Sequence, residues 1–267
     1  TINCLLSLLS YDKGDIEIFG EEITPTNYKL KSQIGVVMQN VAVFDELTVS
    51  ENIDYFCGLY IRDKALRKQY VEEAIAFVGL EHFRKFYPKK LSGGLLRRLN
   101  IACGIAHKPK LIILDEPTVA VDPQSRNKIL EGIVELNKRG ATILYTSHYM
   151  DEVEQICSRI AIIDQGKNLA LGTTEELKKL IKKSEIITID ILTLTEEDLA
   201  AIRHLPHVYE VSFDQHKLTI LCSGGQHNLI HVLDYLQKKN YSFGYVHSEL
   251  PSLNDVFLEI TGKELRD

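Results

Sequence analysis

The sequence lacks several features that would place it in common classes of protein. No window approaches the roughly 20 consecutive apolar residues that a membrane-spanning helix needs. The five cysteines are far apart and form no C-x-x-C pair, which argues against a zinc site or a disulfide framework and favours reduced thiols in the cytosol. Basic residues are not in excess: 31 Lys and Arg stand against 37 Asp and Glu, which argues against a nucleic-acid partner.

The composition that remains is ordinary for a globular protein. Of the 267 residues, 45% are hydrophobic and 25% are charged. A chain of this length can bury one large core and one small core, so the sequence predicts two domains.

Strands and helices alternate through the first two-thirds of the chain. Short runs that are apolar or alternate in polarity predict strands at 14–19, 34–38, 111–114, 142–145 and 160–163. Amphipathic stretches predict helices at 51–60 (with Ser50 as N-cap), 63–78, 95–106, 124–138 and 149–157. Continuous apolar strands that are linked by helices favour an α/β fold with a parallel sheet covered on both faces.

The composition changes after Gly172, where a basic linker helix is expected over 173–184. The following elements are predicted in the order strand, helix, strand, strand, helix, strand, at 185–193, 195–204, 207–213, 217–222, 226–238 and 241–247. This is the β-α-β-β-α-β order of a small α+β ferredoxin-like domain, expected over 185–267. A last helix is expected to start at Pro251 and to end near Gly262.

Two adjacent carboxylates, Asp115 and Glu116, follow the apolar run at 111–114. Open parallel sheets bind ligands at the carboxyl ends of their strands, and adjacent acids there are costly unless they meet a metal ion or a proton to be moved. Asp115 is therefore a candidate Mg²⁺ ligand through water, and Glu116 is a candidate base for an attacking water. The alternative is an ordinary strand end followed by a turn.

Three other segments carry candidate groups. Ser92, Gly93 and Gly94 precede a helical pattern, where exposed N–H groups can bind phosphate, although Ser-Gly-Gly can also be a simple helix cap. His148 follows the strand at 142–145 and is suited to a terminal phosphate or to a purely structural role. Gln39 ends another buried strand and by itself indicates almost nothing.

The order and spacing of these segments resemble the ABC ATPase family over about residues 1–180. The matching motifs are Gln39 (Q-loop), Leu-Ser-Gly-Gly at 91–94 (signature), Leu-Ile-Ile-Leu-Asp-Glu at 111–116 (Walker B), Val-Asp122-Pro (D-loop) and Ser-His148 (switch). The resemblance implies an ATPase domain over 1–172, with a P-loop-NTPase-like parallel sheet and a helical subdomain at about 45–107.

The resemblance also implies roles for these residues. Gln39 and Asp115 would serve Mg²⁺, partly through water, and Glu116 would be the general base. His148 would contact the γ-phosphate of ATP. Ser92, Gly93 and Gly94 would act in trans on ATP held by a second ATPase subunit, identical or different, and Asp122 would link the two sites. The chemistry would be phosphoryl transfer to water, which depends on positioning and charge neutralisation.

The sequence departs from the family in three respects. The family's G-x-x-x-x-G-K-[S/T] motif, or P-loop, does not occur, and Thr1–Leu5 resembles the residues just after it. We therefore expect a chain truncated past this Walker A motif, which neither binds ATP well nor hydrolyses it. Ala120 stands where Gly is usual before the D-loop Asp, and Leu95 and Leu96 stand where Gln and a basic residue are common.

The tail, ending in Ser-Leu-Asn-Asp-Val-Phe-Leu-Glu-Ile-Thr-Gly at 252–262, is similar to the C-terminal domain of bacterial exporter ATPases for drugs, antibiotics or lipids. This implies a subunit on the inner face of the cell membrane that powers a membrane permease. An aromatic socket of Phe44, Tyr55, Phe56 and Tyr60 is one candidate docking face, with core packing as the alternative.

Three other interpretations stay open. One is a regulatory module that naturally lacks the P-loop, against which the retained Glu116 and His148 argue weakly. Another is a soluble ABC ATPase of translation or repair, although such proteins usually carry tandem domains or a coiled-coil insertion. The third is an importer ATPase, whose tail is more often a β-barrel.

Overall fold

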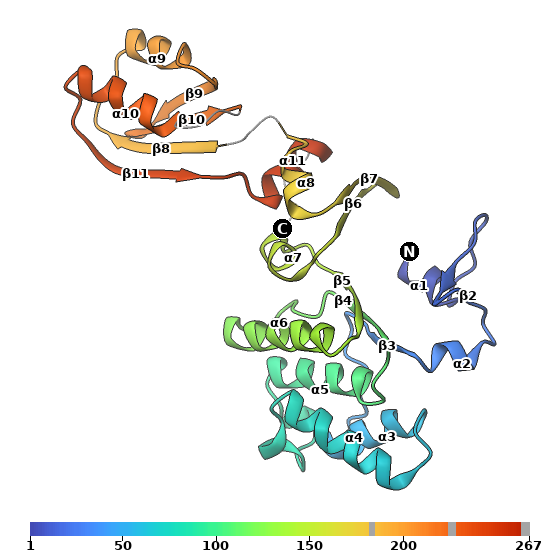
Figure 1. Ribbon diagram of the computed structural model, residues 1–267. Helices are drawn as coiled ribbons and strands as arrows, with labels where there is room; N and C mark the ends of the chain where they lie inside the picture. Colours follow the sequence, from blue (N-terminus) through green and yellow to red (C-terminus); the bar gives the residue numbers. More distant parts are fainter. Residues whose placement is uncertain (182–184, 224–227, 263–267) are drawn as a thin grey trace. The chain divides into compact units, whose positions relative to one another are not determined.

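The computed structural model describes residues 1–181, 185–223 and 228–262 (Figure 1). The chain divides into two compact units, residues 1–152 and 153–267, and each unit is described by itself. Among the described residues, no helix is long and apolar enough to cross a membrane.

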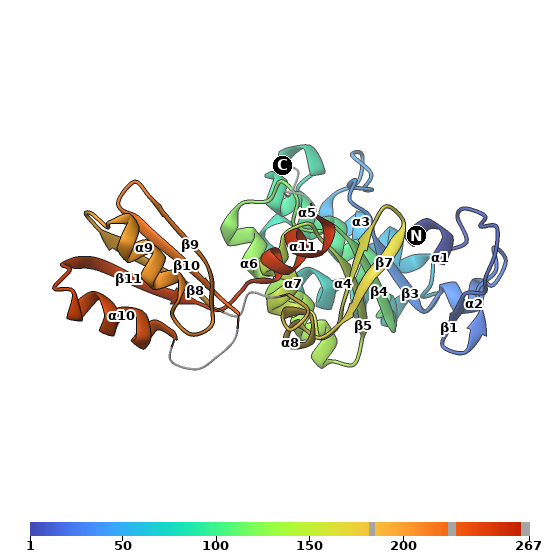
Figure 2. The ribbon, with the colours of Figure 1, turned by 90° about the horizontal axis from the view of Figure 1, so that it is seen from above.

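A parallel sheet of three strands lies at the centre of the first unit: β3 (Ile34–Val37), β4 (Leu111–Asp115) and β5 (Thr142–Thr146), in the order β3-β4-β5. Figure 2 shows the three strands side by side. Ile112, Ile113 and Leu114 are buried, as the apolar run predicts. Because the strands are parallel, their carboxyl ends meet at one edge of the sheet, where the candidate residues follow.

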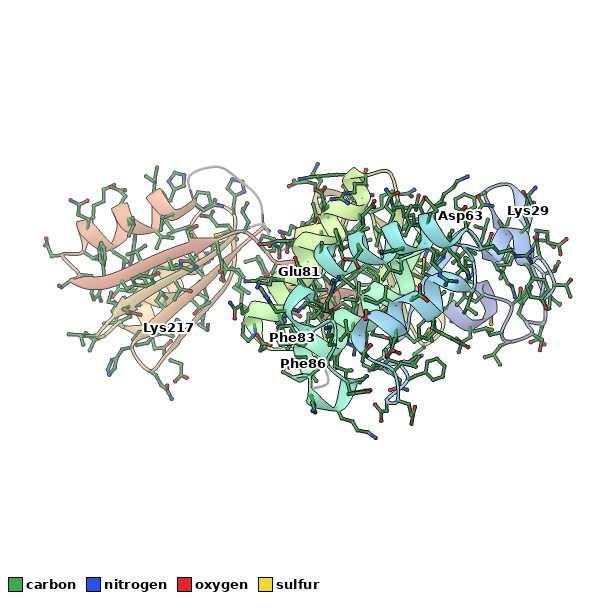
Figure 3. All side chains as sticks on the ribbon, turned by 90° about the horizontal axis from the view of Figure 1, so that it is seen from below. Lys29, Asp63, Glu81, Phe83, Phe86 and Lys217 are labelled. Atoms are coloured by element: carbon green, nitrogen blue, oxygen red, sulfur yellow. The ribbon has the colours of Figure 1, made fainter. Side chains whose placement is uncertain are left out.

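Four longer helices build the rest of this unit: α3 (Val49–Gly58), α4 (Lys64–Phe77), α5 (Gly93–Ile105) and α6 (Pro123–Lys138). α3, α4 and α5 pack on one another, α5 also contacts β3 and α6, and α6 contacts β5. Short 3-10 turns at Glu81–Phe83 and Pro88–Lys90 lead from α4 towards α5. Phe83 and Phe86 pack edge to face in this connection, with ring centroids 5.4 Å apart (Figure 3).

The first residues add a small layer to this sheet. α1 (Ile2–Leu5), β1 (Glu17–Ile18) and α2 (Tyr28–Lys31) share a buried cluster with β3 and β4, and Ile23, which follows the exposed strand β2 (Glu21–Glu22), joins it. The strand predicted at 14–19 is present but shorter, since β1 covers only Glu17–Ile18 and forms a hairpin with β2 that turns at Phe19 and Gly20, both with positive φ. A two-residue turn of this kind ends the strand early.

The second unit begins in α7 (Met150–Ile156) and continues with the antiparallel pair β6 (Ile160–Asp164) and β7 (Lys167–Gly172). The strand predicted at 160–163 therefore exists but does not join the parallel sheet. α8 (Thr174–Lys178) packs against the last helix, α11 (Leu253–Thr261).

The remaining elements follow the predicted β-α-β-β-α-β order. They are β8 (Glu185–Ile191), α9 (Glu196–Arg203), β9 (Val208–Asp214), β10 (Lys217–Cys222), α10 (Asn228–Lys238) and β11 (Phe243–Glu249). The strands are antiparallel in the order β11-β8-β10-β9, and both helices cover one face of this sheet (Figure 1). The α+β architecture expected for the tail is thus present.

Helix starts show where local prediction succeeds and fails. Ser92 is the N-cap of α5, as predicted, and Gly262 ends α11 in the left-handed conformation. The N-cap of α3 is Thr48 instead of Ser50, because Thr48 and Glu51 form a capping box. Pro251 lies before the N-cap Ser252 and is not in the first helical turn. Residues 182–184 of the predicted linker helix and 226–227 of a predicted helix lie outside the described residues.

Candidate nucleotide-hydrolysis site

Asp115 and Glu116 lie at the carboxyl end of β4, beside Thr146 of β5. The Thr146 hydroxyl donates a hydrogen bond of 2.6 Å to Oδ1 of Asp115. The N–H of Glu116 donates to the carbonyl and the hydroxyl oxygen of Thr146, at 3.1 and 3.2 Å. Thr146 therefore fixes both acids, although its sequence position did not single it out. The parallel register of β4 and β5 is the signal that places it there.

The backbone of Glu116 is in the left-handed region, with φ of 47°. A residue with a side chain occupies this region only at a cost of about 1–2 kcal/mol, which the surrounding contacts must offset. The two hydrogen bonds of its N–H to Thr146 supply such contacts. The turn separates the two neighbouring carboxylates, so that they meet different partners.

Two other predicted residues, Gln39 and His148, lie at the side chain of Glu116. Nε2 of Gln39 donates to Oε2 of Glu116 at 2.9 Å, although the two residues are 77 positions apart in the sequence. Nδ1 of His148 lies 3.4 Å from Oε1. The Glu116 side chain is 29% exposed and that of His148 is 49% exposed, so a small ligand can reach both from solvent.

Gln39 is held in place from α5. Its neighbour Met38 accepts hydrogen bonds at its carbonyl oxygen from Arg97 (3.2 Å) and Asn100 (3.4 Å). The carboxamide oxygen of Asn100 accepts from the N–H of Ala42 at 3.1 Å. Arg97 and Asn100 are both buried. The loop that carries Gln39 is therefore hydrogen-bonded to α5, the helix that Ser92 caps.

The Ser-Gly-Gly segment at 92–94 lies beside the D-loop residue Asp122 and the start of α6, and not beside Glu116. Asp122 is the N-cap of α6 and accepts from the N–H of Ser125 at 3.0 Å; this bond and one from the Ser125 hydroxyl lower the pKa of Asp122. A Cβ on Gly94 would lie 2.4 Å from the Ser125 hydroxyl oxygen and 2.9 Å from Oδ2 of Asp122. Gly94 thus allows the starts of α5 and α6 to approach closely. No interaction among the described residues joins Ser92, Gly93 or Gly94 to Glu116.

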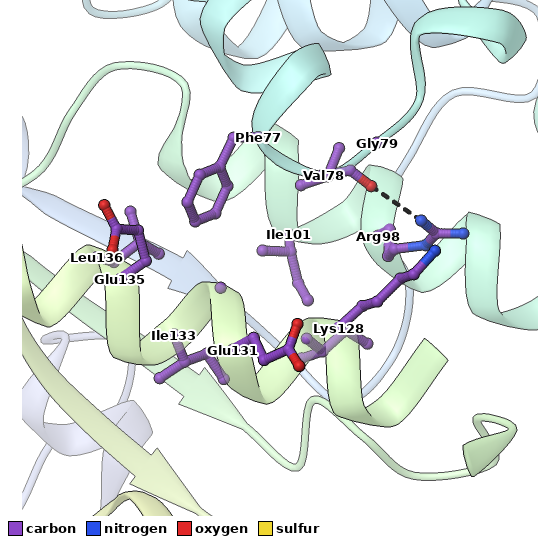
Figure 4. A pocket seen from close by; sticks show the side chains of 12 residues that line it. Phe77, Val78, Gly79, Arg98, Ile101, Lys128, Glu131, Ile133, Glu135 and Leu136 are labelled. Carbon is purple, nitrogen blue, oxygen red and sulfur yellow. Dashed lines mark hydrogen bonds between the residues drawn. The ribbon is translucent and has the colours of Figure 1, made fainter. Parts of the chain in front are cut away.

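The pocket described in the first unit lies elsewhere, between the end of α4, α5 and α6 (Figure 4). It has a volume of about 420 Å³ and is lined by apolar side chains such as Phe77 and Ile101 together with the charged Arg98 and Lys128. One hydrogen bond, from Arg98 to the carbonyl of Val78, crosses its rim at 3.1 Å. None of the candidate residues lines it, so the pocket is not the place where Glu116 acts.

Comparisons with known proteins identify the family of the chain. The family described as "ABC transporter" matches residues 1–119, and the family described as "ATP-binding protein DrrA1-3-like, C-terminal domain" matches residues 172–261. The linearmycin resistance ATP-binding protein LnrL of Bacillus subtilis is 38% identical over 269 residues, covering 100% of this chain and 86% of that protein. This chain belongs to the family of ABC transporter ATP-binding proteins.

Other relatives of this ABC ATPase have similar coverage. A Nod factor export ATP-binding protein I of Ralstonia nicotianae is 30% identical and covers 100% of the chain and 82% of its own length. Among solved structures, an ATP-binding subunit of an ABC transporter aligns with a TM-score of 0.61 at 24% identity, over 67% of this chain and 75% of that one. CbiO1 of Clostridium perfringens aligns with a TM-score of 0.60 at 26% identity, over 66% and 72%. The predicted fold class is thereby confirmed.

Proposed function

We propose that this ABC ATPase hydrolyses ATP to drive an exporter, and that Glu116 is the general base. The observation that carries the proposal is the convergence of Gln39 and His148 on the Glu116 carboxylate at the tip of β4. A general base needs a carboxylate within reach of the attacking water and neighbours that fix its direction. Gln39 fixes one carboxylate oxygen of Glu116, and His148 lies beside the other.

Each side chain has a distinct task in this proposal. Glu116 takes the proton of the water that attacks the γ-phosphorus, and His148 contacts the γ-phosphate and steadies that water. Asp115 and Gln39 offer carboxylate and amide oxygens, which suit Mg²⁺, since this ion takes one or two carboxylates besides water and phosphate. Mg²⁺ would neutralise charge on the phosphates of ATP. Because Asp115 accepts from Thr146 through Oδ1, its Oδ2 is the oxygen left for a metal-bound water.

Hydrolysis is proposed to require two ATPase subunits arranged head to tail, identical or different. Ser92, Gly93 and Gly94 would close over the ATP that the second subunit mainly holds, and Asp122 would connect the two sites. The start of α5 supports this, because exposed N–H groups at a helix start attract phosphate. The separation of this segment from Glu116 within one chain is what a site completed by a second subunit requires.

The cargo class is proposed from the relatives. The names of similar proteins refer to linearmycin resistance, Nod factor export and daunorubicin resistance. We therefore propose a drug, antibiotic or lipid-like molecule as cargo, and a place for this subunit at the cytoplasmic face of the cell membrane. The C-terminal family match, which starts at residue 172, supports the proposed division into an ATPase domain (1–172), a linker (173–184) and a ferredoxin-like domain (185–267).

A membrane permease would dock on an aromatic cluster of Phe44, Tyr55 and Phe56. Their ring centroids lie 4.9 to 5.8 Å apart, and Phe44 and Tyr55 are 42% and 46% exposed. The buried Asn52 fixes the cluster, since its side chain accepts from the N–H of Phe44 and donates to its carbonyl. Tyr60 does not join the cluster, because its ring stacks on His107 at 4.0 Å.

The decisive experiment replaces Glu116 by Gln, which keeps the size of the side chain and removes the base. Because the 267 residues contain no G-x-x-x-x-G-K-[S/T] motif, two forms are compared: the chain itself and the chain with an N-terminal Walker A segment. We expect hydrolysis only in the second form. Glu116→Gln should lower its kcat by roughly a hundred- to ten-thousandfold while ATP binding persists.

The outcomes separate the candidate functions. Hydrolysis that survives Glu116→Gln would refute the role of Glu116. A Walker A form that binds ATP but never hydrolyses it, alone or with a permease, would favour a regulatory module. Hydrolysis that no permease accelerates would favour an ATPase without a transport role.

A further inference from the structure

Glu152 is a buried carboxylate that no part of the proposed mechanism uses. It lies in α7, and its side chain is 1% exposed. A carboxylate can be buried at this level only when hydrogen bonds or opposite charges compensate the lost hydration. The groups that contact this carboxylate therefore indicate its structural role.

Three hydroxyl groups donate to the same oxygen, Oε2 of Glu152. Thr118 donates at 2.7 Å, Tyr145 at 2.6 Å and Ser147 at 3.2 Å. Burial, together with the bond to Glu152, raises the pKa of Tyr145, so that its phenol stays protonated and donates. Thr118 follows the Walker B acids, Tyr145 lies on β5, and Ser147 directly precedes His148. The carboxylate thus joins the segments on both sides of the candidate site.

The other oxygen of Glu152 faces a cation. Nε of Arg126 lies 3.3 Å from Oε1 and forms an ion pair with it. Arg126 is in the first turns of α6, the helix that Asp122 caps. Glu152 is therefore tied by charge to the D-loop helix and by hydrogen bonds to the strand that leads to His148.

Two routes lead from Glu152 to His148. In the first, the Ser147 hydroxyl donates to Glu152 and accepts from the N–H of Tyr149 at 3.0 Å, so the backbone is fixed on both sides of His148. In the second, the guanidinium of Arg126 lies 4.7 Å from the centroid of the Tyr149 ring, and this ring lies 4.2 Å from that of His148. Both routes act on the orientation of one imidazole.

We propose that Glu152 is a positioning residue that holds His148 against Glu116 and links this orientation to the D-loop helix. The proposal rests on the proposed function, because His148 matters for rate only if Glu116 acts on ATP. Glu152 itself is buried and touches no reacting atom. Its removal should therefore change how often His148 is correctly placed, and leave ATP affinity nearly unchanged.

The first test measures this placement without any hydrolysis. In the 267-residue chain, labelled with ¹³C at the His Cε1 position, the signal of His148 is assigned by its loss in His148→Ala. Glu116→Gln should move this signal, because the neighbouring charge disappears. Ser147→Ala should move it as well, although it removes one hydroxyl and leaves Glu152 in place. Glu152→Leu should move it further, whereas Glu152→Gln, which keeps an acceptor oxygen, should move it least.

The second test uses the form that carries a Walker A segment. Glu152→Leu should lower kcat roughly ten- to a hundredfold, since a misplacement of about 1 Å can cost that much, with KM for ATP changed by less than about twofold. Glu152→Gln should restore most of the rate. In a His148→Ala background Glu152→Leu should cause no further loss, because neighbours that act through one group are not additive.

The results decide between positioning and mere stabilisation. Urea unfolding of each variant identifies those that fail to fold, and Ser147→Ala then carries the test, since it leaves the buried charge intact. If Ser147→Ala leaves the His148 signal unmoved, and a folded Glu152→Leu variant does so as well, the proposal is overturned. It is also overturned if the losses from Glu152→Leu and His148→Ala multiply. A signal that moves as expected, together with a Walker A form that does not hydrolyse ATP, would sustain the positioning role and refute the proposed function instead.

Discussion

Replacing Gly94 by Ala should destabilise the first unit, because the starts of α5 and α6 leave no room for a methyl group. The added Cβ would lie 2.4 Å from Oγ and 2.8 Å from Cβ of Ser125, and 2.9 Å from Oδ2 of Asp122. Ser125 is buried and its N–H bonds to the Asp122 cap at 3.0 Å, so it has little freedom to withdraw.

The expected magnitude follows from three contributions. Overpacking of a filled site costs about 1–3 kcal/mol. Disturbing the Asp122 cap adds up to about 1 kcal/mol. The higher helix propensity of Ala returns at most about 1 kcal/mol, and less at a helix start. Gly94→Ala should therefore lower the free energy of unfolding by about 1–3 kcal/mol, which urea denaturation of the 267-residue chain measures as a lower midpoint with an unchanged slope.

Gly93→Ala is the matched control, because a Cβ there would meet only the Ala120 carbonyl oxygen, at 3.9 Å. Its urea midpoint should stay at or slightly above that of the unaltered chain. Ser125→Gly in the Gly94→Ala background removes the clashing atoms and should recover part of the loss. Equal midpoints for Gly93→Ala and Gly94→Ala would refute the close approach of the two helix starts.

Two further predictions concern stability. Burial lowers the pKa of His107 to about 4 from an ordinary 6.5. Between these two pH values the imidazole of His107 is neutral in the folded chain and protonated in the unfolded chain. As the pH drops from 6.5 to 4, the free energy of unfolding should therefore fall by about 3 kcal/mol because of His107. In His107→Phe, which retains a ring against Tyr60, the urea midpoint should fall less over the same pH range. Ala120 has φ of 58°, a conformation that costs about 1–2 kcal/mol for a residue with a Cβ, so Ala120→Gly should raise the thermal midpoint slightly; a lower midpoint would contradict this.

Much of the fold could be predicted from local patterns. The apolar run before Asp115 predicted β4, and Ser92 before two glycines predicted the start of α5. The order of elements after residue 185 predicted the second sheet and its covering helices. These features depend on periodicity and capping, which a few neighbouring residues determine.

Other features depend on partners that are distant in the sequence. The apolar run at 160–163 predicts a strand of the parallel sheet, whereas β6 pairs with β7, since an apolar run does not specify which strand it joins. The cap of α3 is a local exception: the sequence pattern predicts Ser50, whereas the reciprocal bonds of Thr48 and Glu51, three residues apart, select Thr48. A positioning role for Glu152 could not be predicted from the sequence, because the hydroxyl groups that donate to its carboxylate come together only in the folded chain.

The candidate site depends on one register more than on any single motif. Asp115 pairs with Thr146 across β4 and β5, and the Thr146 side chain and carbonyl then fix the left-handed turn at Glu116. His148 follows Thr146 by two residues, so the strand that holds the backbone of Glu116 also delivers the imidazole that lies beside its carboxylate. A slip of one residue between these strands would turn Thr146 to the opposite face and separate all of these groups. The motif letters at 115–116 and 147–148 therefore describe one structural unit, and a substitution that loosens β5 should impair both motifs together.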